Sequence, residues 1–149
     1  MTTTMTRTLT TAATDTARAV TATSIAYWIT TATLAFFIGS GGIAYVLQAD
    51  FTISGFVVLG LPIYVMVLVG VWKVLGSIVI LLPGLPRVKE WAYAGLVFDV
   101  TGAIVAHWAV ADYGAWAFHI VVNLVFLGLA IASWALRPAS RRLGELTQF

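Results

Sequence analysis

The chain of 149 residues is long enough for one domain, and its composition excludes an ordinary soluble one. Hydrophobic residues make up 60% of it and charged residues only 9%, whereas about a quarter of a typical soluble domain is charged. The net charge of +2 comes mainly from basic residues that flank apolar segments, so we expect the lipid bilayer, and not nucleic acid, as the partner.

Residues 1–23 have a composition unlike that of the remaining chain. Almost half of them are threonine, and no helical or strand period of apolar residues runs through them. A low-complexity segment of this kind cannot bury enough apolar surface to offset the entropy lost on ordering. We therefore expect a disordered, threonine-rich N-terminal tail.

Four apolar segments follow, each close to the ~20 residues that cross a bilayer as a helix. They comprise residues 24–47, 61–82, 91–111 and 115–136. Aromatic residues at both ends of the first span match the belts found at membrane interfaces. In the later half of this span, Gly39, Gly41 and Gly42 would let another helix approach closely. The connection at residues 48–60 is too apolar for a hydrated loop, so we expect it to lie in the interface or against the helices.

The basic residues are distributed asymmetrically around these spans. Those outside the spans lie in the N-terminal tail, in the connection between the second and third spans, and in the polar C-terminal tail 137–149; they are Arg7, Arg18, Arg87, Lys89, Arg137, Arg141 and Arg142. Because cytoplasmic loops are enriched in lysine and arginine, both termini are expected to be cytoplasmic. The short connections after the second and third spans make neighbouring helices antiparallel. The sequence thus predicts an all-α, multi-pass protein of the cell (inner) membrane, folded as a four-helix antiparallel bundle.

Lys73 is the only lysine or arginine inside a span. It lies about 13 Å from the cytoplasmic end of the second span at 1.5 Å per residue, and Asp99 lies about 12 Å from the same end of the third. An ion pair is the least costly way to keep both groups charged in hydrocarbon. Two roles stay open for this predicted intramembrane pair: fixing the register of the helices, or lining a binding site.

The same depth arithmetic pairs two histidines near the outer ends of the third and fourth spans. His107 and His119 both lie about 6 Å below the outer boundary, and Asn123 follows His119 by one helical turn. A histidine in a membrane helix commonly hydrogen-bonds to a neighbouring helix, which is the structural alternative to a ligand site. Haem ligation by both histidines is disfavoured, since the short turn joining their helices leaves little room for a porphyrin.

The remaining motifs argue against catalysis by this chain alone. No nucleophile–base signature, phosphate-binding loop or metal-ligand spacing is present, and the absence of cysteine excludes disulfides, thiol redox chemistry and covalently attached haem. The sequence therefore favours a protein with no catalytic activity and no metal site of its own, without settling whether it is an enzyme. Trp72, in mid-span, is interpreted as core or lipid-facing bulk or, alternatively, as part of a ligand site.

The segment from Gly70 to Val110 resembles the DoxX-like family of small membrane proteins, and the runs Ser40–Gln48 and Val58–Val65 fit the first half of the family pattern. The resemblance covers roughly residues 25 to 137. Positions that match the pattern are Lys73, Gly76, Pro83, Lys89, Trp91, Ala92, Asp99, Gly102 and His107. It implies a four-helix membrane bundle. The family is named after a subunit linked to a quinone-reducing oxidoreductase, and most DoxX-like members have no established reaction.

Three functions stay open at this point. The first is an accessory or scaffold subunit of a membrane complex, redox-linked in some relatives, with a membrane-protein partner or a second copy of the chain. The second is a binder of a quinone or another apolar small molecule in the bundle core. The residues that would line such a site are Trp72, Lys73, Asp99, His107, His119 and Asn123. The third is a proton or solute pathway, for which four helices leave little room within one protomer.

Overall fold

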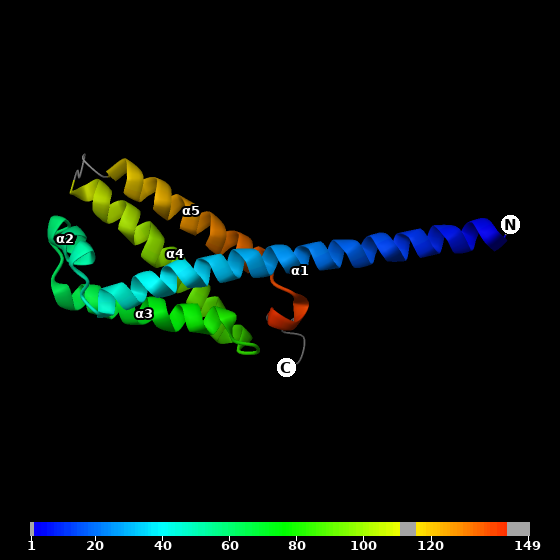
Figure 1. Ribbon diagram of the computed structural model, residues 1–149, viewed down its shortest axis with the longest axis horizontal. Helices are drawn as coiled ribbons and strands as arrows, with labels where there is room; N and C mark the ends of the chain where they lie inside the picture. The colour runs from blue at the N-terminus through cyan, green and yellow to red at the C-terminus, as the bar shows by residue number, and fades with distance from the viewer. Residues whose placement is uncertain (1, 111–115, 143–149) are drawn as a thin grey trace, which may run out of the picture.

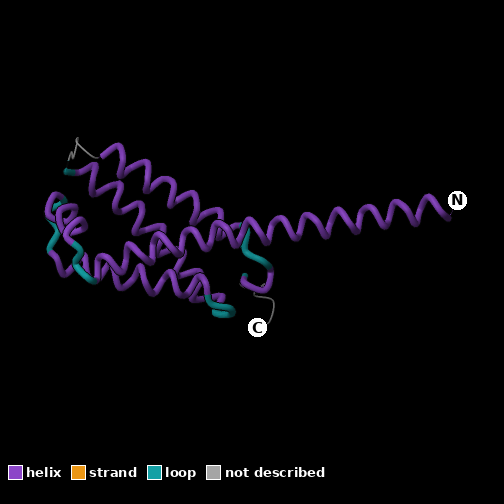
Figure 2. The backbone as a smooth tube through the Cα atoms, viewed as in Figure 1, coloured by secondary structure: helices purple, strands orange, loops and turns teal. Residues whose placement is uncertain are grey.

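The computed structural model describes residues 2–110 and 116–142, and the regular secondary structure within these residues is all helical (Figure 1). The elements are α1 (Thr2–Val46), α2 (Asp50–Val58), α3 (Ile63–Leu81), α4 (Pro86–Ala109), α5 (Trp116–Ala135) and the short 3₁₀ helix η1 (Ala139–Arg141). In the described part of the chain, loops and turns are confined to the short connections between helices and the segment around η1 (Figure 2).

Four of these helices are long and apolar enough to cross a membrane, as the sequence predicts. The membrane-capable segments are Arg18–Val46, Ile63–Leu81, Pro86–Ala109 and Ala117–Ala135. The chain is therefore a multi-pass membrane protein by helix length and composition. Many large apolar side chains on these helices remain exposed in the isolated protomer, as expected where lipid takes the place of water.

The first helix begins earlier than the composition predicts. It starts at Thr2 and includes the threonine-rich segment for which we expect disorder, so the structure differs from the sequence prediction here. The physical reason is that extending a helix from an existing one adds a hydrogen bond for each residue fixed, without a new nucleation step. In Figure 1 this N-terminal part of α1 projects well beyond the other helices.

The segment between the first two spans forms the short helix α2, which contacts both α1 and α3. Phe56 is buried, and its ring meets the ring of Tyr45 edge-on at a centroid distance of 5.1 Å. Phe51 and Val57, on the other side of α2, remain exposed. The apolar character of this connection therefore reflects a helix held against the bundle on one side.

The third span begins five residues before its expected start at Trp91. Leu85 adopts a left-handed conformation (φ 54°), and Pro86 occupies the first turn of α4. Proline suits this position, because it has no N–H group to leave unsatisfied and its φ angle is already helical. Lys89 consequently lies on a helix and not in a loop.

The four long helices pack around one shared core. α3 lies beside α1 and α4 beside α5, while α1 also contacts α5 and α3 contacts α4 (Figure 1). The buried core cluster draws residues from all four helices: Leu34, Ala35, Ile38, Ile80, Tyr93, Leu96 and Ala130.

Two glycines set the distance between α1 and α3. A Cβ added to Gly70 would lie 2.7 Å from Tyr45 Cβ and 2.8 Å from the Gly42 carbonyl oxygen. A Cβ added to Gly42 would lie 2.8 Å from Lys73 Cβ. The backbones are thus in direct contact, as predicted from the glycine-rich run of the first span.

Replacing Gly70 with alanine is expected to lower the free energy of unfolding in detergent by about 1–2 kcal/mol net. Overpacking of this kind costs about 1–3 kcal/mol, and the better helix propensity of alanine offsets up to about 1 kcal/mol. SDS titration followed by circular dichroism measures the change. Gly41→Ala is the matched control, since its Cβ would meet nothing within 4 Å and should be neutral or stabilising. Equal effects of the two substitutions would contradict this packing.

Candidate functional site

Two charged groups within the membrane-capable helices face each other. Lys73 Nζ on α3 lies 3.1 Å from Asp99 Oδ2 on α4, the pairing that their matching depths predict. The ammonium group also lies 4.8 Å from the ring centroid of Tyr45 on α1, where a cation is attracted to the face of the ring. Residues from three helices therefore converge at one junction.

The close contact of α1 with α3 positions this junction. Because no side chain separates Gly42 from Gly70, Lys73 and Tyr45 lie on facing helix surfaces. Asp99 lies at the edge of the buried face of α4, which carries Leu96 and Val100. From this edge the carboxylate reaches Lys73 across the α3–α4 boundary.

The ion pair is not sealed within the protomer. The side chain of Lys73 is 16% exposed and that of Asp99 is 22% exposed. A charged pair left open to hydrocarbon would be costly. This partial exposure distinguishes the ion pair from a purely structural one that packed side chains enclose.

The predicted histidine pair is also in contact, by stacking. The rings of His107 on α4 and His119 on α5 lie 4.1 Å apart between centroids, with an angle of 10° between their planes. A metal ion must lie in the plane of each imidazole that binds it, and two parallel planes about this far apart share no such point. The stacked geometry therefore does not suit bis-histidine ligation of a metal or haem iron.

The remaining predicted site residues lie apart from the ion pair. Asn123 donates from Nδ2 to the carbonyl oxygen of His119, a bond of 2.8 Å within α5. His107 follows Asp99 by eight residues on α4, which is about 12 Å along the axis. Trp72 is 65% exposed, so it does not lie in the core of the protomer. The structure thus forms two separate polar contacts, the ion pair and the histidine stack.

A third polar region was not predicted from the sequence. It lies where α3 ends, α4 begins and α5 ends, and we call its four cations the basic cluster: Lys89, Arg137, Arg141 and Arg142. From their positions, the sequence identifies these residues as orientation signals, which are ordinarily solvent-exposed, and Lys89 also as a position of the family pattern. In the structure Lys89 is 0% exposed and Arg137 only 3% exposed.

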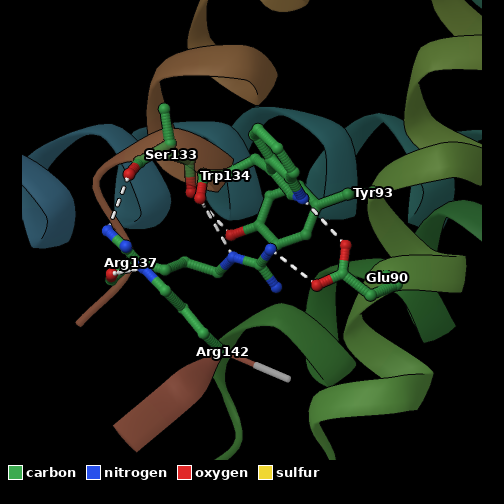
Figure 3. Close-up of polar contacts among 7 residues, drawn as sticks. Glu90, Tyr93, Ser133, Trp134, Arg137 and Arg142 are labelled. Carbon is green, nitrogen blue, oxygen red and sulfur yellow. Dashed lines mark hydrogen bonds and ion pairs between the residues drawn. The ribbon is translucent and has the colours of Figure 1, made fainter. Parts of the chain in front are cut away.

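Arg137 is held by a carboxylate from α4 (Figure 3). Its Nη2 donates to Glu90 Oε1 at 2.7 Å, and Trp134 Nε1 donates to the second oxygen, Oε2, at 2.8 Å. The guanidinium carbon also lies 5.1 Å from the ring centroid of Tyr93. Glu90 thereby ties the beginning of α4 to the end of α5.

A hydroxyl network lies next to this ion pair. Ser133 Oγ is 2.7 Å from the Tyr93 hydroxyl and 2.6 Å from Thr31 Oγ1, and all three side chains are buried. The network joins α1, α4 and α5, and each hydroxyl has a partner for its buried polar oxygen.

Lys89 and the partly exposed Arg141 satisfy the end of α3. Lys89 Nζ donates to the carbonyl oxygens of Val79 (2.7 Å) and Leu82. Arg141 Nη1 approaches the carbonyl oxygens of Leu81 and Leu82 at 3.3 and 3.2 Å. The last carbonyls of a helix lack partners within it and carry partial negative charge, so nearby cations stabilise them. In the sequence, Lys89 follows the residues that end the second span by only a few positions. Whether its side chain returns to the end of α3 depends on the geometry of the turn, which the sequence pattern does not give.

Of the comparisons with known proteins, the one with protein families gave a match. No similar protein was found among curated proteins or among solved structures. A family model for the DoxX-like family matches residues 29–133, which is more than half of the chain and includes all four apolar helices at least in part. The four membrane-capable helices and the match over most of their length show that the chain belongs to the DoxX-like family.

Proposed function

We propose that the four long helices form an up-down antiparallel bundle with both termini in the cytoplasm. The end that would face the cytoplasm contains the basic cluster, and the segment 48–60 at the opposite end contains no lysine or arginine. The contacts of Arg141 with the last carbonyls of α3 support the grouping of the C-terminal tail with the α3–α4 connection. The positive-inside rule then gives the orientation.

We further propose that the protein binds an apolar small molecule with a polar carbonyl head, of the quinone class, at the Lys73–Asp99 junction. The observation that carries this proposal is the residual access to an ion pair at mid-membrane depth. An apolar tail could lie among the exposed apolar side chains, while the head group reaches the charged pair.

The groups at the junction are suited to hold such a head. The Lys73 ammonium group can donate to a carbonyl oxygen, because it has three donors and Asp99 accepts from one of them. The ring of Tyr45 lies beside the ammonium group and offers an aromatic surface for a planar ligand. The histidine stack lies nearer the C-terminal end of α4 than Asp99 does, and it is not part of this site.

The test is to titrate detergent-purified protein with a short-chain ubiquinone and follow quenching of tryptophan fluorescence. We expect saturable quenching for the wild type and for Gly41→Ala, and a loss of affinity of at least tenfold for Lys73→Met, which is about 1.4 kcal/mol. Linear, non-saturable quenching of all three proteins would contradict the site.

A second candidate is an accessory subunit of a membrane complex, in which a partner's helix covers the ion pair. The exposed face of α4 favours it: Gly95 and Gly102 lie on this face, and an added Cβ would meet nothing within 4 Å at either position. Small residues of this kind let another helix approach closely. This candidate predicts that Gly102→Leu disrupts a complex recovered in mild detergent while leaving quinone titrations of the purified chain unchanged.

A further inference from the structure

The basic cluster has more positive charge than its contacts neutralise. The cluster has four cationic side chains, Arg87 in the first turn of α4 is a further, exposed cation at this end of the bundle, and among the described residues one carboxylate, that of Glu90, forms an ion pair with the cluster. The C-terminal ends of α3 and α5 each contribute about half a negative charge through their free carbonyls. The N-terminal end of α4 adds about half a positive charge, so roughly two and a half positive charges of the cluster lack compensation among the described residues.

The hydrogen bonding of the cluster is incomplete as well. Arg137 is 3% exposed, yet its buried Nη1 has no hydrogen-bond partner within residues 2–110 and 116–142. A buried guanidinium nitrogen without an acceptor is costly, since the group stays charged at any accessible pH. An acceptor from outside the described chain would remove this cost.

The outer members of the cluster have donors to spare. All hydrogen bonds from Arg141 to described residues come from Nη1, and each is 3.2 Å or longer. Arg142 is exposed, and it donates from Nε to the Arg137 carbonyl oxygen and from Nη2 to that of Ala135 (Figure 3). Within the part of the chain that the structure describes, Arg141 Nε and Nη2 and Arg142 Nη1 have no acceptor and can donate to a ligand.

The surroundings place this cluster at the level of the lipid head groups. The guanidinium carbon of Arg141 lies 4.7 Å from the ring centroid of Trp28, and the side chains of Trp28, Trp91 and Trp134 are 44%, 82% and 48% exposed. Tryptophan is enriched where the hydrocarbon core meets the head groups. A phosphate of a membrane lipid would therefore lie at the depth of the free arginine donors.

We propose that the basic cluster binds the phosphate of an anionic phospholipid. The phosphodiester oxygens accept from Arg141 and Arg142, and their negative charge offsets that left uncompensated around Arg137. Arginine suits this role because its planar fork of donors matches a phosphate group. The bound lipid stabilises the junction where α3, α4, α5 and η1 meet.

The test is native mass spectrometry of the full chain in detergent with added phosphatidylglycerol or phosphatidylcholine of the same acyl chains. Each arginine near an anionic head group contributes about 1 kcal/mol, which is roughly fivefold in affinity. We expect the wild type to bind phosphatidylglycerol at least ~10-fold more tightly than phosphatidylcholine, and Arg141→Gln/Arg142→Gln to reduce this ratio to below about threefold. Arg18→Gln is the control, because it removes an exposed cation of α1 outside the cluster.

Arg142→Gln alone serves if the double variant does not fold, since Arg142 is exposed; its ratio should fall by roughly fivefold. Equal binding of the two lipids by the wild type, or an unchanged ratio in the arginine variants, would overturn the proposal. Inorganic phosphate separates the two sources of the same chemistry. Millimolar phosphate that displaces phosphatidylglycerol would show a site for free phosphate and overturn the lipid assignment, whereas failure to compete supports it.

Discussion

Lys73→Met is expected to lower the free energy of unfolding by roughly 2–4 kcal/mol, close to the ~3–5 kcal/mol lost when one partner of a buried ion pair is removed. The substitution keeps an unbranched side chain of similar reach but leaves the Asp99 carboxylate without its counter-charge. Asp99→Leu should have a comparable effect, because it leaves the Lys73 ammonium group without its counter-charge. SDS titration of the purified protein in detergent measures both.

The double variant Lys73→Met/Asp99→Leu shows whether the pair itself carries the effect. We expect it to be more stable than either single variant, with a coupling energy of about 1–3 kcal/mol, because it removes both desolvated charges together. Asp50→Asn, at the exposed start of α2, is the control and should change stability by less than about 0.5 kcal/mol. A double variant no more stable than the worse single one would show that the two charges are not directly paired.

Glu90→Gln is expected to destabilise the protein by roughly 2–4 kcal/mol. It removes the one carboxylate that pairs with Arg137 among residues 2–110 and 116–142, and this 3% exposed side chain cannot become neutral by losing its proton. Thermal unfolding followed by circular dichroism in detergent measures this change.

Two further variants separate the charge from the hydrogen bonds of Glu90. Trp134→Phe removes the donor to Glu90 Oε2 and keeps most of the aromatic side chain, so about 1 kcal/mol should be lost. Glu90→Gln/Arg137→Met removes both charges and should recover at least half of the loss. If Trp134→Phe were as damaging as Glu90→Gln, the hydrogen bond and not the ion pair would hold α4 to α5.

The sequence alone was sufficient for the membrane-embedded pairings. Lys73 and Asp99 are isolated charges in apolar helices, so their depth follows from counting residues, and depth nearly determines which groups can meet. His107 and His119 were matched in the same way, although their stacking depends on side-chain rotation, which a residue count does not contain. The number of spans likewise followed from counting the residues of each apolar segment.

The basic cluster could not be found by such counting. Whether Lys89 faces solvent or the end of α3 depends on the left-handed turn at Leu85 and on the direction in which α4 leaves it. The place of Arg137 depends on Glu90, which is distant in sequence and becomes a neighbour only when α4 and α5 pack together. Composition also gave no indication that the helix of the first span continues back to Thr2.

The central claim is that the open Lys73–Asp99 junction holds a quinone-class molecule, and the most direct test is extraction of the protein purified from its native membrane. Organic extracts are examined by mass spectrometry and by ultraviolet absorption before and after borohydride reduction. We predict close to one quinone per chain for the wild type, and less than about a tenth of that for Lys73→Met at equal protein and lipid content. Equal quinone in the two extracts, or none in the wild type, would contradict the claim.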